Sequence, residues 1–148
     1  MAIYGIGADW SGKSKVNEFV RDEKACIGWW IDDAPSLYKI LRQIKIGDII
    51  YIKSSPPGRL IIKAIGFVID DEPFSYNEKT EEHGIYNCIK VKWIWRGKED
   101  LEKINDKYNV RNNTIYEELN PKIQTKIINM ILDKIHSYSR YCETINKK

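Results

Sequence analysis

The sequence predicts an α+β fold in which all 148 residues form one domain. Two apolar, β-rich runs, residues 49–55 and 59–70, are joined through the strong turn residues Pro56, Pro57 and Gly58. A connection this short predicts an antiparallel hairpin, because a parallel pair needs a crossover of a dozen or more residues. Amphipathic helical segments precede and follow the hairpin, and we find no repeat, linker or second domain.

The elements before the hairpin alternate between strand and helix. Residues 2–8 read as a buried first strand, and a polar loop then leads to a short helix within residues 16–23. Residues 25–30, ACIGWW, are expected to form a second strand. Neighbouring strand residues point to opposite faces, so one of Trp29 and Trp30 would face the core. A second helix then leads into the hairpin.

A further strand and a helical segment follow the hairpin. The strand, residues 86–95, alternates so that Trp93 and Trp95 share a face, and core packing is their expected role. Residues 99–106, EDLEKIND, are then expected to be helical.

The last segment, residues 120–141, predicts an amphipathic helix. Asn120 is the expected cap and Pro121 occupies the first helical position. Isoleucines recur at every fourth position, at Ile123, Ile127, Ile131 and Ile135, with Ile128 and Leu132 beside them. We expect this helix to pack on the body of the domain.

Composition and charge exclude several classes of protein. No apolar run approaches the roughly 20 residues of a membrane helix, and the N-terminus lacks the features of a signal peptide, so we expect a cytoplasmic protein. The three cysteines, Cys26, Cys88 and Cys142, have no metal-binding or disulfide spacing and are expected to be thiols. Two histidines are too few for a zinc site, and we expect no metal and no cofactor. The net charge of +3 permits a nucleic-acid partner without demonstrating one.

Residues 7–14, GADWSGKS, match the phosphate-binding loop pattern G-x-x-x-x-G-K-[ST]. Such a loop binds phosphate where it connects a strand of a parallel sheet to the N-terminus of a helix. A second strand of that sheet then ends in the acidic residue that binds magnesium. Here the candidate magnesium strand, residues 61–70, is the second arm of the antiparallel hairpin, and Trp10 adds bulk inside the loop. We therefore interpret the segment as a polar loop after the first strand and disfavour a nucleotide hydrolase.

Three segments carry a resemblance to a known superfamily. Residues 41–68, LRQIKIGDIIYIKSSPPGRLIIKAIGFV, contain a Gly-Asp turn that starts a strand, a short polar turn, and a second strand with a glycine before its apolar end. IGWW, residues 27–30, bears a tryptophan pair, and ADWSGKS, residues 8–14, follows the first strand. Together these segments resemble the PUA-like superfamily, and within it the EVE and YTH branch. The turn Ser-Pro-Pro-Gly departs from the Asn-x-Ser-Gly that is typical of YTH domains.

The resemblance implies a curved mixed sheet or open barrel with flanking helices, and a cavity for one modified base. In YTH domains the base is N6-methyladenine in RNA, and in several EVE-like modules it is a modified cytosine in DNA. The resemblance implies that Trp29 or Trp30 forms part of an aromatic cage. The residues implied to read the polar edge of the base are Asp9, Trp10, Ser11, Lys53 and Ser54. No second aromatic residue of the cage is matched, so the resemblance leaves the identity of the base open.

Elementary chemistry is consistent with such a site. A flipped base needs flat aromatic surfaces and a few polar groups for its Watson–Crick edge. Lys13, Lys15 and Arg59, together with Lys53, lie in predicted loops around the mouth and would neutralise phosphates. Scattered lysines also occur on ordinary solvated surfaces, and tryptophans in ordinary cores.

The leading hypothesis is a non-catalytic, cytoplasmic reader of a modified base, with modified DNA favoured over RNA and no role for a membrane. It would serve a prokaryotic defence system, with an effector protein such as a nuclease as partner. One alternative is a binder of a free nucleotide or nucleotide second messenger, and another is a small P-loop NTPase. No catalytic pattern is found. A small hydrolase could use Lys53 or Lys63 together with Glu72, but the spacing of these residues does not favour either lysine.

Overall fold

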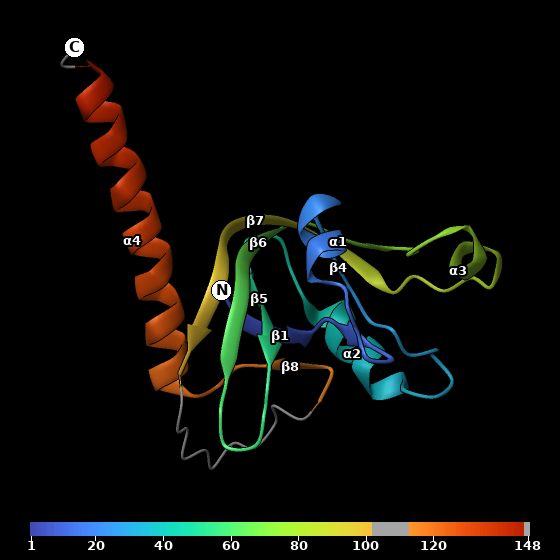
Figure 1. Cartoon of the computed structure of the whole chain (residues 1–148). Coiled ribbons are helices and arrows are strands. Elements are labelled where there is room, and N and C mark those ends of the chain that lie inside the picture. The colour runs from blue at the N-terminus through green and yellow to red at the C-terminus, as the bar shows by residue number, and fades with distance from the viewer. Residues whose placement is uncertain (102–112, 147–148) are drawn as a thin grey trace.

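The computed structural model describes residues 1–101 and 113–146, and its centre is a six-stranded sheet in the order β4-β7-β6-β5-β1-β8 (Figure 1). The strands are β1 (Ile3–Gly7), β4 (Lys24–Cys26), β5 (Ile49–Ser54), β6 (Ile61–Phe74), β7 (Cys88–Asp100) and β8 (Ile115–Glu117). A separate hairpin is made by β2 (Asp9–Trp10) and β3 (Lys13–Ser14). The helices are α1 (Val16–Arg21), α2 (Pro35–Gln43), α3 (Glu78–Glu82) and α4 (Pro121–Asn146).

The sheet is mixed and strongly curled, as Figure 1 shows. Strands β1 and β5 run parallel, and the other neighbours are antiparallel, including the predicted hairpin of β5 and β6. The pairing of the long strands β6 and β7 is interrupted by several register shifts, and irregularities of this kind bend a sheet. Gly66 lies at one of them, where a Cβ atom would be 2.6 Å from the carbonyl oxygen of Lys92. The predicted α+β fold with a curved mixed sheet and flanking helices is therefore confirmed.

Hydrophobic side chains are buried on both faces of the sheet. On one face Ile6, Ile50 and Ile52 pack with α1 and α2, to which Phe19 and Tyr38 belong. On the other face a second cluster joins the sheet to the first turns of α4. That cluster contains Ile3, Ile49, Tyr51, Ile62, Ile65, Tyr116, Ile123, Ile127, Met130 and Ile131.

The tryptophans differ from the prediction in two respects. Strand β4 ends at Cys26, so Trp29 and Trp30 lie outside the sheet, and both are exposed, at 55% and 44%. Neither is a core residue. In β7 a register shift separates Trp93 from Trp95, and the two side chains pack in different clusters on opposite faces. A strict two-residue alternation fails there because the shift inserts an extra residue between them.

Helix α4 begins as predicted but does not pack along its whole length. The side-chain oxygen of Asn120 accepts a hydrogen bond from the amide of Lys122, and Pro121 is the first helical residue. Ile123, Ile127 and Ile131 are buried, whereas Ile135 is 52% exposed. Figure 1 shows the second half of the helix leaving the body of the domain.

The expected helix at residues 99–106 falls partly outside the described chain. Glu99 and Asp100 are the last residues of β7 instead of helical residues, and residues 102–106 lie outside the described ranges. Among the described helices, none has the length and apolar character needed to cross a lipid bilayer.

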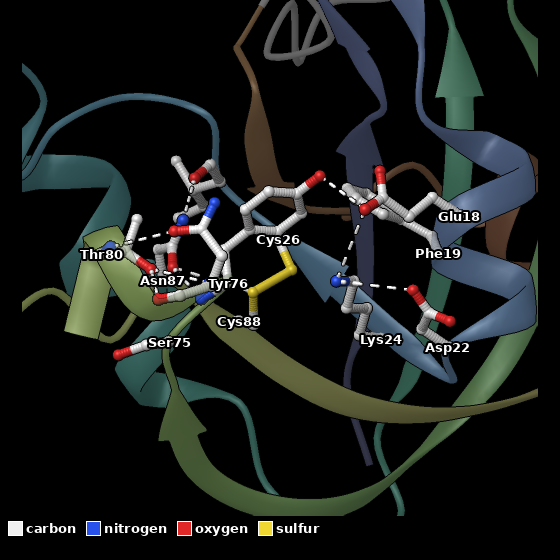
Figure 2. The surroundings of a disulfide bond; sticks show 12 residues. Glu18, Phe19, Asp22, Lys24, Cys26, Ser75, Tyr76, Thr80, Asn87 and Cys88 are labelled. Carbon is white, nitrogen blue, oxygen red and sulfur yellow. Dashed lines mark hydrogen bonds and ion pairs between the residues drawn. A yellow bond between two sulfur atoms is a disulfide. The ribbon is translucent and has the colours of Figure 1, made fainter.

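The expectation of three thiols is wrong for two cysteines. Cys26 and Cys88 form a disulfide between β4 and β7, where they are directly paired across the strands, and both are fully buried (Figure 2). Their 62-residue separation hid this contact in the sequence. Cys142 on α4 is a free thiol.

Candidate functional site

A cavity of about 590 Å³ opens where the parallel strands β1 and β5 end. Because the strands are parallel, the residues that follow them emerge at the same edge of the sheet. The volume lies within the range of pockets that bind small molecules. The lining residues are Gly7, Ala8, Asp9, Trp10, Ser11, Ser14, Val16, Gly28, Trp29, Lys53, Ser54, Ser55, Pro56, Lys63 and Thr114.

One wall of the cavity is the β2–β3 hairpin, which contains most of the GADWSGKS segment. Ser11 and Gly12 have positive φ angles of 52° and 79°, as the two central residues of a type I′ hairpin turn require. Trp10 and Lys13 are partners in the antiparallel pair of β2 and β3, so main-chain groups of this segment are used in pairing the two strands. The segment is therefore a hairpin instead of the open polar loop expected, and it does not wrap around as a phosphate-binding loop does.

The ring of Trp10 is fixed within this wall. Its centroid lies 5.8 Å from that of Phe19 and 4.9 Å from that of Tyr76. Gly28 also lies against the ring, since a Cβ atom there would be 2.9 Å from the indole. The ammonium of Lys15 lies 5.7 Å from the ring centroid. The ring of Trp10 is therefore packed among other residues of the wall.

Trp29 also lines the cavity and is an exposed but anchored side chain. Its Nε1 donates a hydrogen bond of 3.0 Å to the hydroxyl of Thr114, and its carbonyl oxygen accepts one of 2.6 Å from the hydroxyl of Tyr38. The carbonyl of Thr114 also accepts a hydrogen bond from the amide of Gly7 at the end of β1. Trp29 is therefore held in place while its ring remains more than half exposed.

Asn87 and the disulfide support the start of the segment that carries Trp29. The amide of Ile27 donates to the carbonyl of Asn87, and the Asn87 side chain donates back to the carbonyl of Ile27. Asn87 adjoins Cys88 of the disulfide, beside which Figure 2 shows Tyr76 with its hydroxyl directed at Glu18. Burial, and then the hydrogen bond donated to Glu18, raise the pKa of Tyr76 to about 12.

Two polar atoms at the cavity lack a hydrogen-bond partner. Within the described residues, the buried side-chain nitrogens and oxygens without a partner are Nε1 of Trp10 and Oγ of Ser55, and both residues line the cavity. A buried polar group that makes no hydrogen bond costs about 1–3 kcal/mol. A ligand that accepted from the indole and bonded to the hydroxyl would remove that cost.

The cavity also contains charges of both signs. Asp9 supplies a carboxylate, and Lys53 and Lys63 supply ammonium groups. The Lys53 ammonium lies 5.7 Å from the ring centroid of Tyr116, on the strand that neighbours β1. Among the described residues, no group of three potential ligands for a metal ion is found. The side chains that line the cavity can form hydrogen bonds and ion pairs and can stack on a flat ligand.

The structure brings together six of the seven residues predicted to contact a base. These are Asp9, Trp10, Ser11, Trp29, Lys53 and Ser54. The seventh, Trp30, lies outside the lining, and its ring packs edge-on against His83 at 5.5 Å. The choice between the two tryptophans therefore falls on Trp29.

The three predicted phosphate contacts are not gathered at the cavity. Lys13 is exposed at the start of β3, Lys15 forms an ion pair with Glu18, and Arg59 forms one with Asp100. None of the three is among the lining residues.

Sequence reasoning missed several lining residues. Ser55 follows the predicted Ser54 directly, so extending the polar run by one residue would have found it. Gly28 and Thr114 carry no local signal, because their roles depend on contacts with Trp10 and Trp29.

The candidate residues for a hydrolase are not assembled. Lys53 and Lys63 both line the cavity, whereas Glu72 lines a different hollow together with Asp22 and Lys90.

The chain matches a family model. No curated protein matches the chain. The model, described as "Domain of unknown function (DUF8426)", matches residues 4–119, which include β1 from its second residue, the strands β2 to β8 and every residue that lines the cavity. The matched region ends two residues before α4 begins at Pro121. The chain therefore belongs to the DUF8426 family.

Proposed function

We propose that this chain is a nucleic-acid-binding module that takes a modified base, flipped out of its strand, into the cavity beside Trp29. The observation that carries the proposal is that the same cavity is lined by the anchored, exposed Trp29 and by two residues, Trp10 and Ser55, that each have a buried polar atom without a hydrogen-bond partner. A flipped base needs a flat surface for its ring and polar partners for its edge. The cavity supplies both.

The resemblance to PUA-like domains of the EVE and YTH branch supports the same function. The curled mixed sheet and the position of the cavity, between the segment after β1 and the segment after β4, agree with what that resemblance implies. We propose a PUA-like fold on this basis, modified DNA as the favoured nucleic acid, the cytoplasm as the compartment, and an effector protein such as a nuclease as partner. Such a module would bind without catalysing a reaction.

A free nucleotide or nucleotide second messenger is the second candidate, and the positions of the cations favour it. Lys15 and Arg59 are engaged by Glu18 and Asp100, and with Lys13 they lie outside the cavity lining. A long phosphate backbone would need several cations around the mouth. Lys53 and Lys63 line the cavity itself, where a small ligand would bring one phosphate group close to them.

The test is a titration with matched oligonucleotides that carry methylated or hydroxymethylated cytosine, N6-methyladenine or no modification, at two salt concentrations. The contribution of phosphate contacts to the affinity should fall as the salt concentration rises. The modified base should increase the affinity by an amount that is the same at both salt concentrations. Equal affinity for all of the oligonucleotides would reject the modified-base pocket. Binding of free nucleotides alone would establish the second candidate.

Trp29→Ala and Trp30→Ala form a matched pair of variants for this titration. Both side chains are exposed, so both proteins should fold, but only Trp29 lines the cavity. Loss of base stacking should weaken binding by about 1–3 kcal/mol in the Trp29 variant, and the Trp30 variant should bind like the parent. Equal binding by the two variants would rule out Trp29 as the stacking residue.

A further inference from the structure

The free half of α4 carries an apolar stripe that the domain does not cover. From Leu132 to Asn146 the helix extends about 22 Å at 1.5 Å per residue, and Figure 1 shows this part projecting away from the body. Tyr138 is 70% exposed, and Ile135 and Ile145 are about half exposed. Apolar side chains on a projecting helix are typical of a surface that another molecule covers.

The stripe has the spacing of a coiled coil. Its residues alternate in steps of three and four, which is the heptad pattern that places side chains on the seam between two helices. The seam residues are Ile128, Ile131, Ile135, Tyr138, Cys142 and Ile145, and Leu132 and Tyr141 flank them. Ile131 is already buried against the domain, so the free seam continues a face that packs within the chain.

We propose that the covering partner is a second copy of this chain, joined through the free half of α4. A heptad seam is complementary to itself, and an interface between identical helices uses the same patch on both copies. The flanking charges permit the pairing: between residues 132 and 146, Asp133 and Glu143 balance Lys134 and Arg140. Within this stretch two copies therefore do not repel each other, although the sequence continues with Lys147 and Lys148.

The uncovered side chains of the stripe are large. Ile128, Leu132, Ile135, Tyr138, Tyr141 and Ile145 are each between 38% and 70% exposed, so pairing of two copies would remove a continuous row of apolar surface from water. An antiparallel pair would place the tip of each helix towards the body of the other copy.

The position of the helix relative to the family match supports a separate role. The match ends at residue 119, and α4 starts at Pro121. All residues that line the cavity lie before this helix. Association through α4 is therefore independent of what the cavity binds.

The experiment is sedimentation velocity of the full chain from micromolar to about 200 µM. The expected result is a rise from the monomer mass of 17.4 kDa towards twice that value. Replacing both Ile135 and Tyr138 by lysine should keep the protein monomeric or weaken dimerisation at least tenfold, because charges would then lie in the seam. Circular dichroism and a thermal melt should show an unchanged fold.

The control replaces Ser137 and Thr144 by lysine on the opposite side of the same helix. Each of these hydroxyls bonds only to a carbonyl of its own helix, four residues back. This variant carries the same added charge as the first and should dimerise like the parent. A monomeric parent at every concentration, or equal dimerisation of the two double variants, would overturn the proposal.

Discussion

The indole nitrogen of Trp29 donates a 3.0 Å hydrogen bond to the hydroxyl of Thr114, which lies 85 residues further along the chain. The bond links the segment after β4 to the residue that precedes β8 and positions a ring that is more than half exposed. Orienting a bulky exposed side chain costs conformational entropy. Holding the ring in advance removes that cost from ligand binding, because the side chain need not be ordered when the ligand arrives.

The first prediction follows from this bond. Thr114→Val removes the acceptor while keeping the shape of the side chain, and we expect ligand affinity to fall about five- to tenfold, as for the loss of one hydrogen bond of about 1 kcal/mol. Stability should change little, since the site is exposed. Thr114→Ser keeps the hydroxyl and should bind like the parent. Isothermal titration of the best ligand measures both variants, and an unaffected valine variant would show that the anchor is dispensable.

The second prediction concerns the unsatisfied atoms in the cavity. Trp10→Phe and Ser55→Ala each remove a buried polar atom without a partner, so neither should lower the stability through a lost hydrogen bond, and Ser55→Ala should be neutral or slightly stabilising. Both variants should bind ligand more weakly if these atoms contact it. Urea unfolding and titration together check this. A marked loss of stability in Ser55→Ala would mean that its hydroxyl has a role inside the protein.

The parts of the site that the sequence predicted are those that follow strands directly. Asp9 to Ser11 come after β1 and Ser54 ends β5, and the pairing of these strands brings both groups to one edge. Trp29 was assigned to a strand because ACIGWW reads as a continuous β-rich run, yet β4 stops at Cys26. Its real position depends on hydrogen bonds to Tyr38 and Thr114, and such distant partners leave no periodic signal.

The pairing of β4 with β7 was hidden for the same reason. Cys26 and Cys88 face each other only because these strands are neighbours, although β4 precedes the hairpin and β7 follows it. The opposite facing of Trp93 and Trp95 depends on a register shift in the pairing of β6 with β7. Local alternation predicts faces correctly only where no extra residue is inserted.

The third prediction tests the disulfide. Thiol titration of the unfolded, air-oxidised protein should give one thiol per chain, that of Cys142, and three after reduction. Cys88→Ser should lower the free energy of unfolding by about 2–4 kcal/mol under oxidising conditions, because the bridge constrains the unfolded chain. The parent treated with reductant should lose a similar amount. Three thiols without reduction would show that the two sulfurs are unbonded.

The fourth prediction uses the pKa of Tyr76, which burial and the hydrogen bond to Glu18 raise to about 12. The unfolded value is about 10, so the folded state holds the proton more tightly, and this contribution to stability is complete below pH 10. It is lost as the pH rises from 10 towards 12. Tyr76→Phe should therefore be less stable than the parent at pH 7, and the difference should shrink above pH 10. Urea unfolding of both proteins at several pH values measures it, and a constant difference up to pH 11 would contradict the assignment.

The last prediction concerns a buried polar cluster on the face of the sheet that α4 covers. The hydroxyl of Tyr51 donates a 2.6 Å hydrogen bond to the carboxyl of Glu118 and lies 2.7 Å from the hydroxyl of Tyr116. The other carboxyl oxygen accepts from the amide of Asn120, so the cluster joins β5 and β8 to the start of α4. Burial raises the pKa of Tyr51 well above its usual value, and the hydroxyl therefore remains a donor.

Tyr51→Phe removes that donor inside a buried cluster. We expect the free energy of unfolding to fall by about 1–3 kcal/mol, with the loss of packing near zero because the ring remains. Tyr86→Phe, at a tyrosine that is 55% exposed, removes the same atom from the surface and should change stability by less than about 0.5 kcal/mol. Equal effects in the two variants would mean that the hydroxyl of Tyr51 contributes no more than one exposed to water.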